Sequence, residues 1–266
     1  LRLNGSIPRL SETISTNCLR CGPYFTIAVG EEINLNVSTD QSKKISVYAG
    51  NYHSIHDGKK RLYHEYWIGF DARPMNALSV SFEPIYNQQY CMLQYVATAA
   101  MNGDPRYVFA TIDQKTLIFT FRLNYTLNPE LTLEYYGQPF VSAGKYTEFK
   151  RITVPDADDF EDRYRLFAQD EISYSTADNV YSVDDDADGT IDYSFDNPDF
   201  NFRQFRSNLV IRWEYLPGST LYLVWSQGRT STASNGLFSV GEDMRELFDI
   251  VPHNVFLLKF SYWFSL

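Results

Sequence analysis

Residues 117–127 read Leu-Ile-Phe-Thr-Phe-Arg-Leu-Asn-Tyr-Thr-Leu, and the order of apolar and polar side chains in this stretch decides the fold class. Every odd-numbered position is apolar or aromatic, whereas most even-numbered positions are polar and include Arg122 and Asn124. Successive side chains of a β-strand point to opposite faces, so this alternation predicts a strand with one apolar face and one polar face. Its eleven residues match the ~9–11 residues with which a tilted strand crosses a bilayer.

The same alternation recurs along the chain, for example in residues 62–72, 209–215 and 256–264. Turn sequences containing proline separate these runs, as at 128–130 and 216–219. Together the runs and turns predict twelve antiparallel strands, at 2–14, 24–37, 43–52, 60–72, 76–86, 88–99, 106–112, 116–127, 131–141, 201–215, 219–231 and 253–265. For the pair 106–112 and 116–127 the alternative is one long strand with a bend at residues 113–115.

The lengths of the connections predict how these strands are arranged. Most short connections fall at one end of the sheet, and the long ones (15–23, 53–59, 142–200 and 232–252) fall at the other. Short turns at one end and long loops at the other are typical of outer-membrane barrels. The fold class expected from the sequence is therefore all-β, an antiparallel transmembrane β-barrel that forms one domain over residues 1–266.

A soluble β-sandwich also alternates apolar and polar residues and is the first alternative. The predicted strands are longer than the ~5–6 residues that are usual in globular sheets. Charged side chains also lie in the middle of strands on the second face, which suits a water-filled lumen better than a packed protein surface. These charged and polar residues include Arg122, Glu134, Gln138, Arg212, Glu214 and Lys259.

The barrel prediction states which face of the sheet contacts lipid and which faces the lumen. Six apolar residues should face lipid: Phe119, Phe121, Leu123, Phe256, Leu258 and Phe260. Arg122, Asn124 and Lys259 should face the lumen. The last strand should pair with 219–231, and in a barrel closed within this chain its other edge should meet residues 2–14. If that edge is unpaired, the chain forms part of a larger barrel.

The composition limits the partners of this chain. The formal net charge is −10, and residues 155–200 hold 15 Asp and Glu against only two basic residues, Arg163 and Arg165. An acidic excess argues against nucleic acid as the main partner. Its position predicts one long acidic extracellular loop within residues 142–200. The chain begins at Leu1 without a signal peptide, and we expect a mature chain or a fragment.

The sharpest local motif lies in this acidic segment, where residues 184–192 read Asp-Asp-Asp-Ala-Asp-Gly-Thr-Ile-Asp. Ca²⁺ prefers six to eight hard oxygen ligands, and carboxylates at alternate positions followed by a glycine can wrap around one ion. Position 12 is Phe195 rather than glutamate, so the motif is not an EF-hand. The predicted metal ligands are Asp184, Asp186, Asp188, Thr190 and Asp192, and the predicted cofactor is Ca²⁺ in a structural role. The alternative is a solvated acidic loop.

Other chemistry is weakly indicated. Cys18 and Cys21 form a single C-x-x-C motif without the strand and helix that a redox site requires, and a plain loop is the better interpretation. The four histidines form no motif that supplies three or four zinc ligands. Glu134 and Glu214 could pair for glycoside hydrolysis, but lumen lining explains them better. No catalytic residue is therefore predicted.

Six segments carry a resemblance to a known family: 19–23, 38–44, 106–116, 133–140, 196–208 and 212–227. The longest reads Arg-Trp-Glu-Tyr-Leu-Pro-Gly-Ser-Thr-Leu-Tyr-Leu-Val-Trp-Ser-Gln. Together they resemble the C-terminal barrel region, a domain of unknown function, of bacterial outer-membrane proteins. Those proteins carry an N-terminal domain like the family 9 carbohydrate-binding modules, which is missing here. The resemblance covers most of residues 19–264 and implies an envelope location and a link to glycans, without established catalytic residues.

The expected function is that of a non-enzymatic outer-membrane barrel that anchors, binds or passes material, with glycans among the ligands that the resemblance implies. Its expected partners are outer-membrane lipid, glycan and other envelope protein subunits. The two alternatives are an outer-membrane hydrolase that uses lumen carboxylates and a soluble carbohydrate-binding sandwich.

Overall fold

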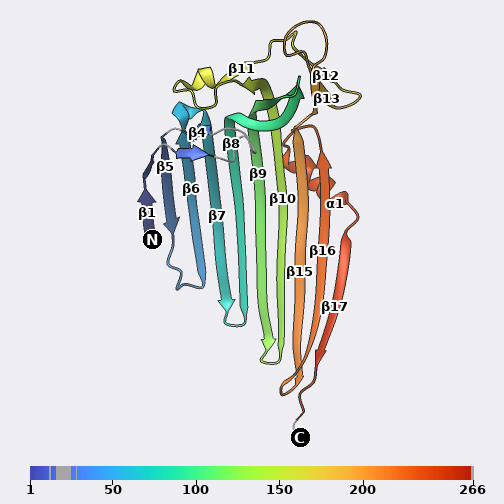
Figure 1. Ribbon diagram of the computed structural model, residues 1–266. Helices are drawn as coiled ribbons and strands as arrows, with labels where there is room; N and C mark the ends of the chain where they lie inside the picture. Colours follow the sequence, from blue (N-terminus) through green and yellow to red (C-terminus); the bar gives the residue numbers. More distant parts are fainter. Residues whose placement is uncertain (12, 16–24, 28, 265–266) are drawn as a thin grey trace.

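The computed structural model describes residues 1–266 except 12, 16–24, 28 and 265–266. The chain is all-β, and ten strands, most of them long, lie side by side in one antiparallel sheet (Figure 1). In spatial order these strands are β1 (Arg2–Ser6), β5 (Gly30–Ser38), β6 (Ile45–His56), β7 (Arg61–Met75), β8 (Leu78–Met101), β9 (Asp104–Asn128), β10 (Leu131–Ile152), β15 (Phe200–Leu216), β16 (Ser219–Ala233) and β17 (His253–Ser261). The predicted antiparallel all-β class is therefore confirmed.

Short elements complete the fold. The two-residue strand β2 (Arg9–Leu10) pairs with β5, and β11 (Tyr164–Leu166) pairs with β10. Two small sheets are formed by β3 (Thr13–Ser15) with β4 (Phe25–Ile27), and by β12 (Ile172–Ser175), β13 (Val180–Val183) and β14 (Tyr193–Asp196). The helical elements are η1 (Asp57–Lys59), η2 (Phe160–Arg163) and α1 (Val240–Asp249). No helix among the described residues has both the length and the apolar character needed to cross a membrane.

Several predicted strand boundaries are wrong. The breaks expected near residues 87 and 114 are absent, and β8 and β9 each continue as one long strand. The backbone ladder between them passes through both places, pairing Asn87 with Thr116, and the Gln88 amide donates a 2.7 Å hydrogen bond to Asp113. Polar side chains therefore mark these positions, but they satisfy one another across the strands and need no turn.

The strand boundaries also differ from the prediction around the acidic segment and near the N-terminus of the chain. Strand β10 ends at Ile152 rather than at residue 141, so part of the predicted long loop belongs to the sheet. Further short strands order much of the remaining segment. The predicted strand 2–14 is divided into β1, β2 and β3, with Pro8 between the first two. Proline has no N–H to donate to a ladder, which explains the interruption.

The cross-strand register separates the sheet into two faces of opposite character. One row of directly paired residues is Leu123, Tyr135, Leu209, Trp225 and Phe256, from β9 to β17. The neighbouring row on the other face is Asp71, Ser81, Arg122, Tyr136, Asn208 and Ser226. We call these the apolar face and the polar face.

The predicted sidedness is confirmed as a separation of the side chains into two sets. Phe119, Phe121, Leu123, Phe256, Leu258 and Phe260 share the apolar face, whereas Arg122, Asn124 and Lys259 share the polar face.

The two margins of the sheet lie far apart. Strand β17 pairs with β16 as predicted, with Leu258 opposite Leu223. Strand β1 pairs with β5, and the described residues show no pairing between β1 and β17. In Figure 1 these two strands lie on opposite sides of an open sheet. Closure between residues 253–265 and 2–14 is therefore not observed.

The main core lies at the upper ends of β8, β9 and β10, beneath the connection 153–199, which we call the head (Figure 1). Two clusters cover these strand ends. The first contains Met101, Val108, Ala110, Phe149, Val183, Tyr193 and Phe195. The second contains Leu93, Phe109 and Ile152 with surrounding aromatic residues. Adjacent residues such as Val108 and Phe109 belong to different clusters, so these strand ends are covered on both faces.

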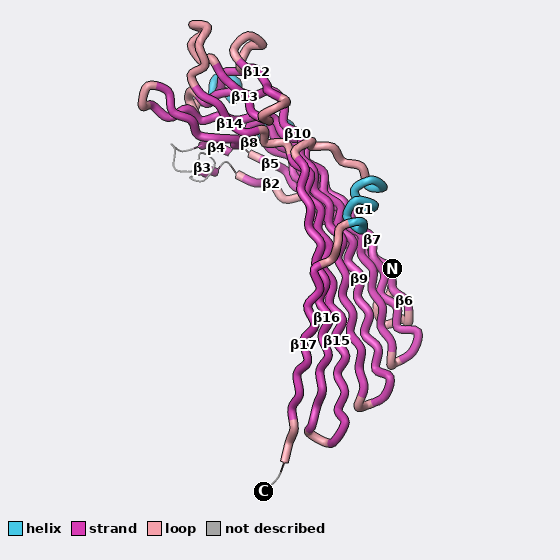
Figure 2. Tube along the Cα trace, turned by 90° about the vertical axis from the view of Figure 1, so that its right-hand side faces the viewer, coloured by secondary structure: helices cyan, strands magenta, loops and turns pink. Residues whose placement is uncertain are grey.

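Helix α1 covers the upper part of the apolar face beside β10, β15 and β16, as the edge-on view of Figure 2 shows. Its Leu247 side chain is fully buried, and Phe248 contacts the ring of Phe205 at 5.3 Å between centroids. Asp243 is also buried and accepts a 2.8 Å hydrogen bond from Asn201. Below this helix the apolar face is uncovered in the described structure.

The replacement Leu247→Ala should loosen this helix, because truncating a buried leucine costs about 2–5 kcal/mol. Amide hydrogens of residues 240–249 should then exchange with solvent at least ~30-fold faster, measured by hydrogen–deuterium exchange. Arg245→Ala, at an exposed position of the same helix, should leave the exchange unchanged. Equal exchange in both variants would show that Leu247 does not anchor the helix.

Candidate functional site

The predicted calcium motif forms the connection between β13 and β14 at the far end of the head. Ligand oxygens of Asp184, Asp186 and Asp188 all lie within 4.8 Å of one another. Backbone N–H groups hold the loop: Gly189 donates to Asp184 at 2.8 Å, and Asp188 donates to Asp186 at 3.2 Å. Positive φ angles at Ala187 (58°) and Gly189 (90°) turn the chain back toward β14.

The other two predicted ligands have different partners. The Thr190 hydroxyl and N–H both donate to Asp188, at 2.6 and 2.8 Å. Asp192 accepts a 2.7 Å hydrogen bond from the N–H of Asp185 and so closes the base of the loop. The structure therefore gathers Asp184, Asp186 and Asp188 and gives Thr190 and Asp192 supporting positions, and calcium binding stays a prediction.

The electrostatics of the loop are uneven. Partial loss of hydration and the adjacent charge of Asp188 raise the pKa of Asp186 above its usual value. The two hydrogen bonds from Thr190 lower the pKa of Asp188. A divalent cation would relieve the repulsion at Asp186, because an opposite charge favours the ionised carboxylate.

We expect calcium to bind this loop in the range of extracellular modules, with Kd of about 10⁻⁴–10⁻³ M, measured by calorimetry. Binding should be lost in the double variant Asp186→Ala, Asp188→Ala and retained in Asp178→Ala, an exposed aspartate of the neighbouring turn. Affinity should fall as the pH is lowered through the raised pKa of Asp186, because a protonated carboxyl cannot ligate. Equal heats from both variants would identify a solvated acidic loop.

The second residue of the same motif, Asp185, has a different role. Asp185 turns inward, and its side chain is fully buried among three arginines. Its Oδ2 accepts hydrogen bonds from Arg106 Nε, at 3.1 Å, and from Arg151 Nη1, while its Oδ1 accepts from Arg165 Nη2 at 3.2 Å. Arg165 Nη1 also donates to both carboxylate oxygens of Glu171, at 2.6 and 2.8 Å. We call these five residues the arginine cluster.

A buried hydroxyl adjoins the arginine cluster. Tyr193 is 8% exposed, and its hydroxyl has no hydrogen-bond partner among the described residues. Burial, followed by the nearby charge of Asp185, raises the pKa of this phenol. Tyr193 therefore stays neutral and offers an O–H group beside Arg106 and Arg151.

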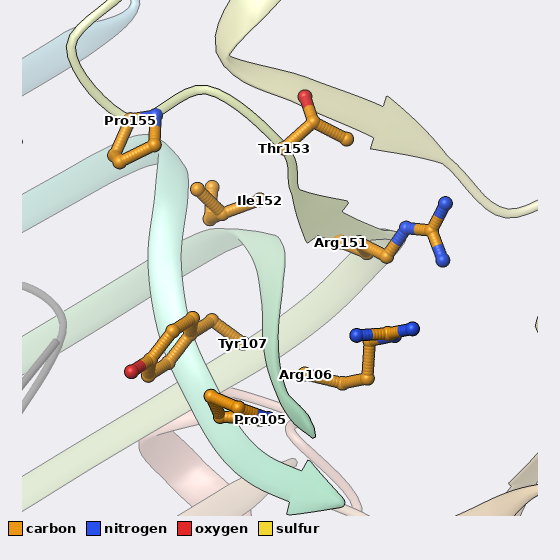
Figure 3. A pocket seen from close by; sticks show the side chains of 7 residues that line it. All are labelled: Pro105, Arg106, Tyr107, Arg151, Ile152, Thr153 and Pro155. Carbon is orange, nitrogen blue, oxygen red and sulfur yellow. The ribbon is translucent and has the colours of Figure 1, made fainter. Parts of the chain in front are cut away.

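A pocket of about 370 Å³ opens beside two of these arginines (Figure 3). The pocket lies where β9 begins and β10 ends. There β9 pairs with β8, whereas β10 pairs with β11, and the pocket opens between the two strand ends. Figure 3 shows the Arg106 and Arg151 guanidinium groups together on one side, and the Tyr107 and Pro155 rings on the other. The lining residues are Pro105, Arg106, Tyr107, Arg151, Ile152, Thr153 and Pro155.

Sequence reasoning missed the arginine cluster, although one signal was present. The alternation of β13 places Val183 on the buried side, and two residues later Asp185 continues that side. Asp184 is then half-buried and Asp186 is exposed. The three arginines could not be assigned in this way, because they come from β9, β10 and β11, far apart in the sequence.

The variant Asp185→Asn should open the head, because removing one partner of a buried ion pair costs about 3 kcal/mol or more. Amide exchange in residues 164–196 should accelerate ~100-fold or more, and the same measurement on Asp184→Asn should show little change. If the two variants exchange alike, the arginine cluster does not hold the head together.

The two alternatives considered from the sequence, a carboxylate pair and a histidine site, gain no support from the geometry. Glu134 and Glu214 lie on adjacent strands, but four residues separate Glu214 from Val210, the residue opposite Glu134. At ~3.3 Å per residue this offset is ~13 Å, more than the ~6.5–9.5 Å of an inverting carboxylate pair. His53 and His64 do meet, with Nδ1 atoms 2.6 Å apart, but two imidazoles are fewer than zinc requires.

The cysteines give no redox site in the described part of the chain. Cys91 is buried and free, whereas Cys18 and Cys21 lie outside the described residues. The predicted interpretation of the C-x-x-C motif as a loop is therefore untested.

Comparison with known proteins gives one match. Residues 18–265 match the model of a family described as a domain of unknown function (DUF5916). No curated protein matches significantly, and no solved structure does.

Proposed function

The chain belongs to the DUF5916 family, and we propose that its sheet is part of the wall of a transmembrane β-barrel in a bacterial outer membrane. The proposed role is non-enzymatic: the wall anchors the head at the outer surface, where it can bind material. One observation carries this proposal, the wide apolar face that no other part of the described structure covers below α1.

The exposure of this face is large at both margins of the sheet. On β17, Phe256, Leu258 and Phe260 are 70, 67 and 64% exposed. On β5 and β6, the side chains of Leu35 and Val47 are also exposed. Soluble monomers rarely expose a continuous apolar patch of more than a few hundred Å², and larger patches mark membrane or protein contacts. A face that crosses ten strands is of the second kind.

The height of the apolar band fits a membrane. On β9 the band runs from Leu117 to Leu127, which at ~3.3 Å per residue is about 33 Å along the strand. Strands of outer-membrane barrels are tilted by ~35–45°, which reduces this length to about 25 Å along the membrane normal. The apolar band of such barrels is about 25 Å tall.

The upper border of the band is sharp. Tyr66 and Tyr86 are paired across β7 and β8 at the top of the band. One step higher on the same face, the cross-strand row consists of polar residues: His53, His64, Gln88 and Lys115. Aromatic residues followed by polar residues are typical of the membrane–water interface. This border would place the head outside the membrane, with the short turns at the opposite surface.

The polar face suits a wet lumen. The Arg122 guanidinium lies over the Tyr136 ring, 4.9 Å from its centroid, and Gln138 donates a 3.1 Å hydrogen bond to Thr120. Arg212 pairs with Glu214 at 2.8 Å. Charged groups of both signs at mid-strand positions are stabilised by water, whereas contact with lipid would cost ~2–4 kcal/mol for each arginine.

The proposal requires that the free edges of β1 and β17 become paired. In lipid every backbone polar group needs a partner, so an open sheet cannot span a bilayer. We propose that further strands complete the ring between these two margins. A soluble sandwich would instead need a second sheet over the apolar face.

Single-tryptophan variants distinguish these alternatives, with the remaining tryptophans changed to phenylalanine. Trp225 lies on the apolar face, opposite Phe256, whereas Trp67 lies on the polar face, opposite Gly50. In vesicles with brominated lipid tails, the fluorescence of Trp225 should fall by more than about half, and that of Trp67 should change little. Trp67 is the matched control.

Two results would contradict the membrane proposal. Equal quenching of both tryptophans would show that the two faces do not meet different solvents. Absence of quenching, together with failure of the protein to float with vesicles in a density gradient, would favour a soluble protein.

A further inference from the structure

We infer that the pocket beside Arg106 and Arg151 binds a small organic anion, an acidic monosaccharide unit whose carboxylate meets the two guanidinium groups. This inference goes beyond the proposed barrel, because it concerns a pocket between the strand ends and the head and does not depend on the lipid contacts of the sheet.

The charge of the site favours an anion. The arginine cluster contains three guanidinium groups and two carboxylates, Asp185 and Glu171, which leaves one positive charge in excess. The pocket lining itself contains two arginines and no acidic residue. This cationic site lies within the most acidic part of the chain, so the excess is local rather than a property of the whole head.

The two arginines have donors to spare. Each guanidinium carries five N–H groups in a planar fork. Arg106 and Arg151 each give one N–H to Asp185, and Arg106 makes a further weak contact with the sulfur of Met101 at 3.7 Å. Their side chains remain 26 and 25% exposed, on the side that lines the pocket. Asp185 thus orients both guanidinium groups but leaves other N–H groups of each available. Such N–H groups can hold the carboxylate of a ligand with charge-assisted hydrogen bonds.

The opposite side of the pocket is suited to a ring. The rings of Pro105 and Pro155 line the pocket (Figure 3), whereas Tyr107, the strand neighbour of Arg106, directs its ring away from the guanidinium groups. The volume of about 370 Å³ lies at the lower end of the ~300–1,000 Å³ of small-molecule sites and leaves room for one sugar ring. An acidic sugar has an apolar C–H face for these rings and a carboxylate for the arginines. Inorganic phosphate would leave the apolar side unused.

The test is calorimetry on the whole protein in detergent, with glucuronate as the probe and glucose and inorganic phosphate as comparisons. Glucuronate should bind more tightly than both. Arg151→Lys should weaken binding ~3-fold and Arg151→Gln at least ~10-fold, because the charge is retained in the first variant and the fork is lost in both. Arg245→Gln, on the exposed face of α1, is the matched control and should bind like the parent chain.

Because Arg151 pairs with a buried carboxylate, its variants could disturb the head. Thr153→Trp is therefore the second variant: Thr153 is an exposed residue that lines the pocket, and its hydroxyl donates to the carbonyl of Asp162 at 3.2 Å. An indole there should block binding while the arginine cluster keeps its ion pairs and the amide exchange of residues 164–196 stays unchanged. Equal affinity for glucose would overturn the role of the charge. Equal affinity for phosphate would overturn the role of the ring. Absence of binding by all three probes, with the head intact, would show that the arginine cluster is only a structural ion-pair network.

Discussion

The register between neighbouring strands is the constraint on which the rest of the structure depends. Side chains alternate with a period of two, so a slip of one residue between any two strands would move a whole set of apolar residues to the opposite face. The rows from Leu123 to Phe256 and from Asp71 to Ser226 remain separate across the strands that they join. The continuous apolar face, the polar face and the border between Tyr86 and Gln88 all follow from this one regularity.

The alternation of apolar and polar residues is visible in the sequence. The all-β class, and which residues share each face of the sheet, could therefore be predicted. Strand ends could not be predicted in the same way. Polar runs at 87–89 and 113–115 look like turns, yet the two runs lie opposite each other in β8 and β9 and pair side chain to side chain. The upper part of β10 was assigned to a loop for a related reason. Its residues Lys150 and Arg151 are charged, and their partners, Thr111 and Asp185, are distant in the sequence.

The candidate sites show the same division between local and distant information. Asp184, Asp186 and Asp188 come together because they lie in one short loop, and a spacing rule is enough to find them. The pocket depends on three strands and on a buried aspartate that the same rule treats as one more acidic residue of the loop. A motif search cannot distinguish Asp185 from its neighbours. In the structure Asp185 is buried among the arginines, whereas its neighbours belong to the candidate calcium loop.

The long strands β8, β9 and β10 run continuously from one part of the molecule to the other, with register irregularities between Cys91 and Ala97 and between Thr147 and Lys150. Their lower halves form the band, and their upper halves are covered on both faces by the head. Arg106 and Arg151 belong to β9 and β10 themselves, so the pocket is built on the ends of the same strands that carry Phe121 and Tyr135 in the band. A ligand held by these arginines is therefore attached to the wall of the sheet rather than to a separate flexible domain. In a membrane wall, this arrangement would fix the height of the pocket above the lipid surface, because the ladder between β9 and β10 fixes the distance along the strands.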